Sequence, residues 1–98
     1  MKVTVLGTGS WGTALAKVLA ENSHEVLIWG RDQRVVEEIN QGHTNHRYLK
    51  KTHLPATLVA TADFEAAIQR AEAILIVIPT HAMREIVQRI EAVLQDQS

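Results

Sequence analysis

Apolar runs and amphipathic stretches alternate along the 98 residues of the chain. Three apolar runs and one weaker run predict four strands. We expect them at residues 3–6, 25–29, 57–60 and 73–78. Apolar residues at helical spacing after each run predict four helices, at residues 10–22, 32–40, 63–71 and across the stripe 83–94. This alternation is typical of an α/β protein whose parallel sheet carries helices on both faces.

The expected strand order is third, second, first, fourth, with a ligand in the crevice between the first and fourth strands at their carboxyl ends. The run 73–78 does not alternate, so both faces of this strand are expected to be buried. It would also be an edge strand, and an all-apolar edge is an aggregation hazard. We therefore expect the chain either to be the front part of a larger protein or to pair with another chain.

The first predicted helix carries an apolar stripe made of Trp11, Leu15, Val18 and Leu19. This stripe is expected to face the core. For Trp11 the alternative of a direct ligand contact stays equally open. The small residues Ala14 and Ala16 suit close packing near the turn that precedes the helix.

The first strand runs directly into Gly7-Thr8-Gly9-Ser10-Trp11-Gly12, a Gly-x-Gly-x-x-Gly pattern at the start of a helix. In that context Gly7 allows the sharp turn, Gly9 lets a pyrophosphate approach the backbone, and Gly12 lets the helix lie close to the strand. The helix N-terminus and the Ser10 hydroxyl can add hydrogen bonds to phosphate. The pattern predicts a dinucleotide site in a Rossmann-type fold.

Residues 41–56 lose all periodicity and form a long polar loop for so small a domain, which is often a functional feature. His43, His46 and His53 lie here, but no cysteine or carboxylate cluster completes a closed metal site, so we expect solvated histidines and no metal. The basic residues of this loop can attract phosphate or simply be solvated. His81 lies at the start of the last predicted helix beside the crevice, where it can face a substrate, but we expect it to cap that helix or to face solvent.

Composition narrows the class of protein. The net charge of −1 gives no reason to expect a nucleic-acid partner, and the absence of cysteine excludes disulfides and thiolate chemistry. No segment is long enough to span a bilayer, and the chain begins with strand residues where a signal peptide would need a longer apolar run. We therefore expect a cytoplasmic protein without a membrane partner.

Four blocks of sequence resemble the bacterial NAD(P)-dependent glycerol-3-phosphate dehydrogenases, in the same order and over nearly the whole chain. They are residues 5–16 around Ser-Trp-Gly-Thr-Ala, 24–32 with Trp-Gly-Arg-Asp, 45–49 ending in Tyr-Leu, and 77–81. Ser23 departs from the glycine usual in the family. The resemblance implies reversible reduction of dihydroxyacetone phosphate to glycerol 3-phosphate for phospholipid synthesis.

The resemblance also implies cofactor contacts at Ser10, Trp11 and Arg31, and places Pro79 along the cofactor on its nicotinamide side. The family's catalytic lysine belongs to a helical second domain, and a further lysine follows the last helix; the chain stops before both. No catalytic residue is therefore carried over. We expect residues 1–98 to be an incomplete NAD(P)-binding domain that binds cofactor but does not turn it over.

The cofactor can be NADP or NAD. An NAD-preferring fold has a carboxylate where Trp29 stands here, and Arg31 can grip a 2′-phosphate, so NADPH should be accepted at least as well as NADH. Gly30 would leave room for the ribose, and Asp32 is expected to cap the next helix and pair with Arg31. A non-catalytic dinucleotide-sensing module, or a ketopantoate-reductase-like or 6-phosphogluconate-dehydrogenase-like enzyme, remains an alternative, and a homodimer is left open.

Overall fold

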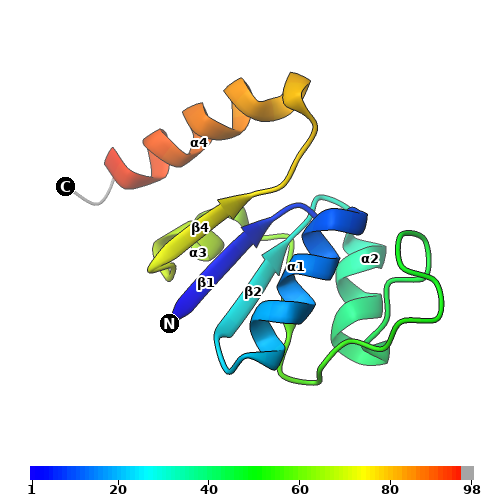
Figure 1. The fold of residues 1–98 in the computed structure, drawn as a ribbon. Helices are drawn as coiled ribbons and strands as arrows, with labels where there is room; N and C mark the ends of the chain where they lie inside the picture. Colours follow the sequence, from blue (N-terminus) through cyan, green and yellow to red (C-terminus); the bar gives the residue numbers. More distant parts are fainter. Residues whose placement is uncertain (96–98) are drawn as a thin grey trace.

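A computed structural model describes residues 1–95 as a four-stranded parallel sheet flanked by helices (Figure 1). The strands are β1 (Lys2–Leu6), β2 (Glu25–Trp29), β3 (Val59–Thr61) and β4 (Ala73–Ile76). The α-helices are α1 (Ser10–Glu21), α2 (Gln33–Glu37), α3 (Phe64–Gln69) and α4 (Met83–Gln95). A π-helical turn, η1 (Glu38–Gly42), continues α2, and a 3-10 turn, η2 (Thr80–Ala82), precedes α4.

The strand order is β3-β2-β1-β4, as predicted, and every neighbouring pair is parallel. Leu6 at the end of β1 is level with Trp29 of β2 and with Ile76 of β4. The carboxyl ends of these three strands therefore meet at one edge of the sheet. The order in which the chain adds strands reverses between β1 and β4, which creates the expected crevice.

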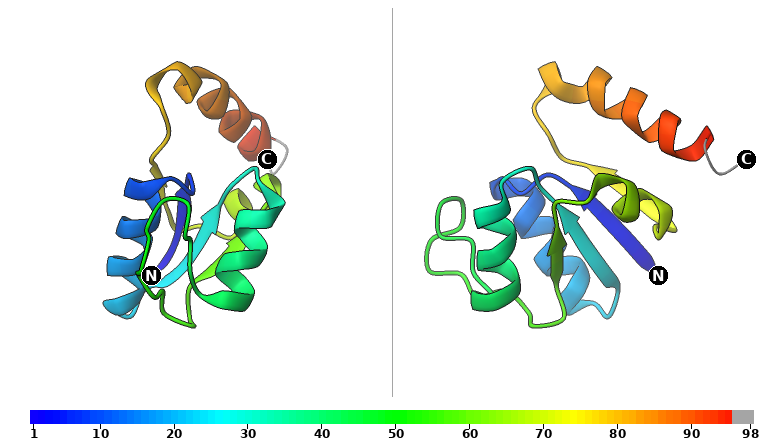
Figure 2. Two further views of the ribbon diagram at one scale, coloured as in Figure 1. Left: turned by 90° about the vertical axis from the view of Figure 1, so that its right-hand side faces the viewer. Right: turned by 180° about the vertical axis from the view of Figure 1, so that it is seen from behind.

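Two apolar layers cover the two faces of the sheet. On one face Val5 and Ile28 pack with Ala16 of α1 and Val36 of α2. On the other face Leu6 packs with α3 and α4, through residues that include Phe64, Ile68, Ile86 and Val93. The ribbon views show α4 lying away from α1 and α2 (Figure 2). Helices on both faces confirm the α/β architecture.

The prediction that the apolar stripe of α1 faces the core was wrong for three of its four residues, and Leu19 alone of the stripe packs against the core. Trp11 is 82% exposed and Val18 51% exposed, and Leu15 is also exposed. The buried residues of α1 are small ones, namely Gly12, Thr13, Ala16 and Ala20. Small side chains let α1 lie close to the sheet, and the other three apolar residues of the stripe are exposed.

The prediction that β4 is buried on both faces is confirmed only in part. Leu75 faces the layer of α1 and Ile76 the layer of α3, but all four residues of the strand stay partly exposed. The cause is that β4 ends the sheet and no strand pairs with its outer side among residues 1–95. Its ladder stops at Ile76, and Val77 then donates one hydrogen bond to the Leu6 carbonyl, 2.9 Å.

The predicted cap at Asp32 is confirmed, and Asp63, the first residue of the helix expected at 63–71, also caps its helix. The Asp32 carboxylate accepts from the Arg34 N–H at 2.9 Å, and the Asp63 carboxylate accepts from the Ala66 N–H at 3.1 Å. The helix expected at 32–40 instead changes to π-helical geometry at Glu38 and ends at His43 in a left-handed conformation (φ 54°). Over residues 1–95 no helix combines the length and the apolar character that a membrane span requires.

Candidate functional site at the strand ends

A cavity of about 460 Å³ opens at the carboxyl ends of β1, β2 and β4. The loop after β1 contributes Gly7, Thr8 and Gly9, and the end of β2 contributes Trp29 through Asp32. The segment after β4, the start of α4 and Tyr48 from the long loop complete the wall. A second hollow of about 440 Å³ borders the other part of the glycine loop, which is residues 7–12, and is lined by Ser10, Trp11, Gly12 and residues 76–79.

The predicted site residues are divided between these two hollows. Gly7 and Arg31 line the larger cavity, whereas Ser10, Trp11 and Gly12 line the second one. Gly9 and Pro79 line both. The structure therefore brings all seven residues to one edge of the sheet, with Gly9 and Pro79 where the two hollows adjoin.

The three glycines of the loop have different surroundings. Gly7 has φ 125°, and a Cβ there would overlap the Val77 carbonyl oxygen, so the turn requires glycine. A Cβ on Gly12 would overlap the Gly7 carbonyl oxygen, because α1 begins directly against the strand end. A Cβ on Gly9 would meet nothing within 4 Å. Among these three, only Gly9 keeps open space beside the backbone.

The amino end of α1 points unpaired N–H groups toward this region. The first bond of the helix runs from the Thr13 N–H to the Gly9 carbonyl at 3.0 Å, so the preceding N–H groups have no partner within the helix. The Ser10 hydroxyl is placed differently from the expectation, because it donates to the Tyr48 carbonyl at 3.0 Å. Its proton is therefore directed at the long loop and not at a phosphate.

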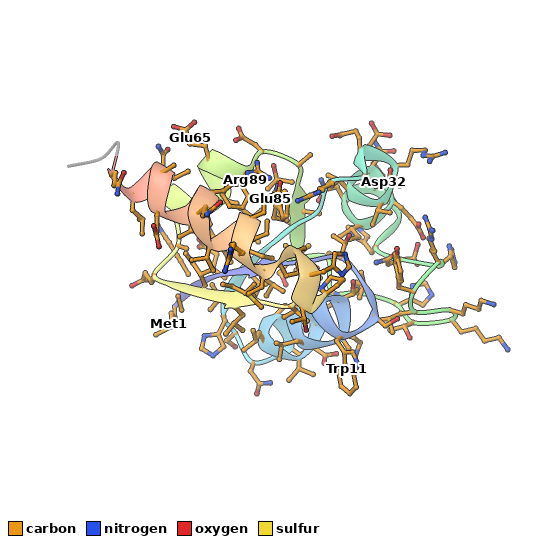
Figure 3. The ribbon with its side chains drawn as sticks, turned by 90° about the horizontal axis from the view of Figure 1, so that it is seen from above. Met1, Trp11, Asp32, Glu65, Glu85 and Arg89 are labelled. Carbon is orange, nitrogen blue, oxygen red and sulfur yellow. The ribbon has the colours of Figure 1, made fainter. Side chains whose placement is uncertain are left out.

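Trp11 lies outside the core. Its side chain projects outward from the amino end of α1 (Figure 3), and it is the most exposed of the large apolar residues in the part of the chain described here. Of the two interpretations left open for Trp11, helix-to-core packing is wrong. The indole is available to a ligand in the second hollow.

The end of β2 carries charge on the rim of the larger cavity. An Arg31 guanidinium nitrogen lies 3.5 Å from a carboxylate oxygen of Glu85 on α4, and the guanidinium lies 6.0 Å from the Trp29 ring centroid. The expected pairing of Arg31 with Asp32 is not formed; Asp32 instead lies 3.6 Å from the Arg34 guanidinium. Gly30 lines the cavity, but the room beside it is filled by the Thr8 side chain rather than left for a ribose.

Hydrogen bonds join the long loop to the glycine loop, a contact that the sequence did not predict. Asn45 is fully buried, and its amide nitrogen donates to the Thr8 carbonyl at 2.9 Å and to the Thr13 hydroxyl oxygen at 3.0 Å. Tyr48 lines the larger cavity. In an aperiodic polar stretch nothing distinguishes a buried asparagine from a solvated one. The length of the loop, its basic residues and the family-like block at residues 45–49 were signals that it had a function, but none of them pointed to this contact.

The histidines of the loop do not converge. The His46 ring nitrogen Nδ1 lies 2.9 Å from a Glu38 carboxylate oxygen, and residues 1–95 contain no group of three or more metal-ligating side chains. Burial opposes ionisation of Glu38. Hydrogen bonds from the His46 N–H and the Thr44 hydroxyl, with the charge of His46, outweigh it and lower the pKa of Glu38. His81 lies on the wall of the larger cavity.

Comparison with known proteins gives a consistent result. The family model described as "NAD-dependent glycerol-3-phosphate dehydrogenase N-terminus" matches residues 2–98. The chain is 50% identical over 96 residues to a glycerol-3-phosphate dehydrogenase [NAD(P)+] of Macrococcus caseolyticus, covering 98% of this chain and 29% of that protein. The corresponding protein of Staphylococcus saprophyticus is 52% identical over 93 residues, covering 95% and 28%.

A solved structure agrees with these matches. The crystal structure of glycerol-3-phosphate dehydrogenase from Coxiella burnetii superimposes with a TM-score of 0.86 at 38% identity, over 94% of this chain and 28% of that one. The chain thus spans less than a third of the length of the relatives it matches. From the match over residues 2–98, the chain belongs to the family of NAD-dependent glycerol-3-phosphate dehydrogenases and corresponds to their N-terminal region.

Proposed function

We propose that residues 1–98 are the cofactor-binding part of an NAD(P)-dependent glycerol-3-phosphate dehydrogenase. The observation that carries this proposal is the position of Gly9. It has no neighbour within 4 Å of its missing Cβ, lines both hollows, and precedes the free N–H groups of α1. Such an arrangement binds the pyrophosphate of a dinucleotide through the backbone and the positive end of the helix dipole.

The two hollows then receive the two halves of the cofactor. The adenosine half would lie in the larger cavity near Trp29 and Arg31, whose guanidinium can pair with a 2′-phosphate. The nicotinamide half would lie toward Trp11 and Pro79 in the second hollow. The bound dinucleotide supplies a hydride, and the chain supplies binding and orientation.

The substrate and its catalytic groups belong to the remainder of a longer protein. There the reaction would be reversible hydride transfer between NAD(P)H and dihydroxyacetone phosphate, giving glycerol 3-phosphate for phospholipid synthesis in the cytoplasm. A general acid near the substrate carbonyl is required. We assign it to a helical domain beyond Ser98, so that residues 1–98 contribute no catalytic residue.

Binding and turnover test this division of roles. Calorimetry should detect weak binding of NADPH and NADH to residues 1–98, and a reductase assay with dihydroxyacetone phosphate should detect no oxidation of either cofactor. The full-length gene product should oxidise NADPH or NADH with that substrate. Turnover by residues 1–98 alone would overturn the assignment of the catalytic group, and absence of dinucleotide binding would overturn the proposed site.

A further inference from the structure

The long loop after η1 is joined to the glycine loop at a buried point. Asn45 has no exposed surface although it lies in a polar segment that is otherwise largely exposed. Its amide nitrogen donates to two oxygens of the glycine-loop region, the Thr8 carbonyl and the Thr13 hydroxyl. The Thr13 hydroxyl in turn donates to the same Thr8 carbonyl at 3.1 Å. The Thr8 carbonyl oxygen therefore accepts two hydrogen bonds, one from the long loop and one from α1.

This fixed carbonyl sets the direction of the next N–H. In a trans peptide the carbonyl and the following N–H point in opposite directions, and the chain has no cis peptide bond among residues 1–95. Because the Thr8 carbonyl points at Asn45 and Thr13, the Gly9 N–H points away from them. None of the backbone hydrogen bonds found within residues 1–95 uses this N–H. Gly9 borders both hollows, so its N–H is available to a ligand there.

The unfavourable burial of the Asn45 side-chain oxygen indicates that this position requires the hydrogen-bond donor of the Asn45 amide group. The Asn45 side-chain oxygen is buried and has no hydrogen-bond partner within the described part of the chain. An unpartnered buried acceptor is unfavourable, and an apolar side chain of similar size would avoid it. The Thr8 carbonyl can only accept, so the amide nitrogen must face it and the oxygen must take the unpartnered position. Asn45 thus supplies a donor at this point although its acceptor is left unsatisfied.

We infer that Asn45 is a positioning residue for dinucleotide binding: it holds the Thr8–Gly9 peptide so that the Gly9 N–H faces the pyrophosphate. This inference rests on the proposed dinucleotide site. It also gives the long loop a function, because the same segment places the Tyr48 carbonyl on the Ser10 hydroxyl and Tyr48 in the cavity wall. Any shift of the loop would alter the peptide that meets the phosphates.

The substitution Asn45→Asp tests the donor directly. An ionised carboxylate only accepts and would face the Thr8 carbonyl, whereas a protonated carboxyl can donate one hydrogen bond to it. Binding of NADP⁺ should be measured by calorimetry between pH 8 and pH 5 for the variant and the wild type. We expect the variant to bind at least ten-fold more weakly at pH 8. The ratio of the two dissociation constants should approach one as the pH falls and the introduced carboxylate takes up a proton.

Dividing the dissociation constant of the variant by that of the wild type at the same pH cancels the effect of groups that titrate in both proteins. Glu38, His43 and His46 lie around this loop and are common to both proteins. A matched control is Asn40→Asp, because Asn40 donates to the Ala60 carbonyl at 2.9 Å and accepts from the Ala60 N–H at 2.7 Å, away from the glycine loop. The control should lower the unfolding temperature and leave NADP⁺ binding within two-fold of wild type.

Each outcome has a distinct meaning. Binding by Asn45→Asp within two-fold of wild type at pH 8, or a loss that is the same at every pH, would overturn the inference. If that variant does not fold, the Gly9 amide signal of the wild type decides by nuclear magnetic resonance. NADP⁺ should shift it more than the Asn40 or Ala60 amide signals, and an unmoved Gly9 signal would overturn the inference. A wild type that fails to bind NADP⁺ would instead contradict the proposed dinucleotide site.

Discussion

Replacing Gly9 should separate cofactor binding from folding. The Gly9 backbone has φ −72° and ψ −172°, which any residue adopts, and its Cβ position is open for 4 Å. Alanine at a compatible position gains about 0.4–1 kcal/mol by restricting the unfolded chain. Alanine is a poorer helix N-cap than glycine by an amount on the order of 0.5 kcal/mol. These effects oppose each other, so Gly9→Ala should change the free energy of unfolding by less than about 0.5 kcal/mol.

The effect on binding should be larger than the effect on stability. The added methyl group would occupy the space through which, in the proposed site, the pyrophosphate reaches the Gly9 N–H. A lost hydrogen bond to a charged group costs roughly 1.5–3 kcal/mol, which corresponds to a dissociation constant about 10- to 150-fold higher. The larger side chain of Gly9→Val should remove measurable binding while the helical circular dichroism is kept. Calorimetry with NADPH measures the dissociation constant, and thermal circular dichroism measures the stability.

Gly12→Ala is the matched control in the same loop. Its Cβ would overlap the Gly7 carbonyl oxygen, so α1 must move away from the strand end. Overpacking of this kind costs about 1–3 kcal/mol. For a domain of this size each kcal/mol lowers the unfolding temperature by roughly 4–8 °C. The reasoning is refuted if Gly9→Ala binds NADPH like the wild type, or if it melts as early as Gly12→Ala.

Three further predictions concern other parts of the chain. Arg31→Ala should weaken NADPH binding by about 1.5–3 kcal/mol and leave NADH binding nearly unchanged in calorimetry, whereas equal losses would show that Arg31 serves the adenine or the fold. The lowered pKa of Glu38 in the folded state contributes stability that is present above its unfolded-state pKa and lost as the pH falls through the folded-state pKa. Urea midpoints between pH 7 and pH 3 should therefore fall more steeply for the wild type than for Glu38→Gln, and parallel curves would contradict this. The free apolar edge of β4 and the exposed stripe with Val18 should make residues 1–98 self-associate; sedimentation of a stable monomer at high concentration would count against it.

The sequence predicted the elements where local signals were strong. β2 has the predicted bounds, Glu25–Trp29, because a run of apolar residues is closed by Gly30. The start of α3 was recognisable from Asp63 followed by apolar residues at helical spacing. The strand order followed from general rules for parallel sheets, and it placed the cavity at the ends of β1 and β4.

The incorrect predictions share a physical cause. The spacing of apolar residues along a helix or strand does not show which other residues pack against each of its faces. The stripe with Trp11 and Val18 has helical spacing, but α1 meets the sheet through Ala16 and other small residues. β4 was expected both as an edge strand and as a strand buried on both faces; the edge is confirmed, and because no neighbouring strand covers it within residues 1–95, all four residues of β4 stay partly exposed. Asn45 contacts Thr8, 37 residues away, through one side chain in an irregular loop, a contact that no local pattern encodes.

The pairing of β1 with β4 also determines when during synthesis the sheet can close. β1 pairs on one side with β2, which leaves the ribosome soon after it, and on the other side with β4. The Lys2 N–H donates to the Glu72 carboxylate across a separation of 70 residues. At typical translation rates this interval takes roughly 4–14 s. For that time one side of the central strand β1 has no partner strand, so the sheet is complete only after β4 has been synthesised.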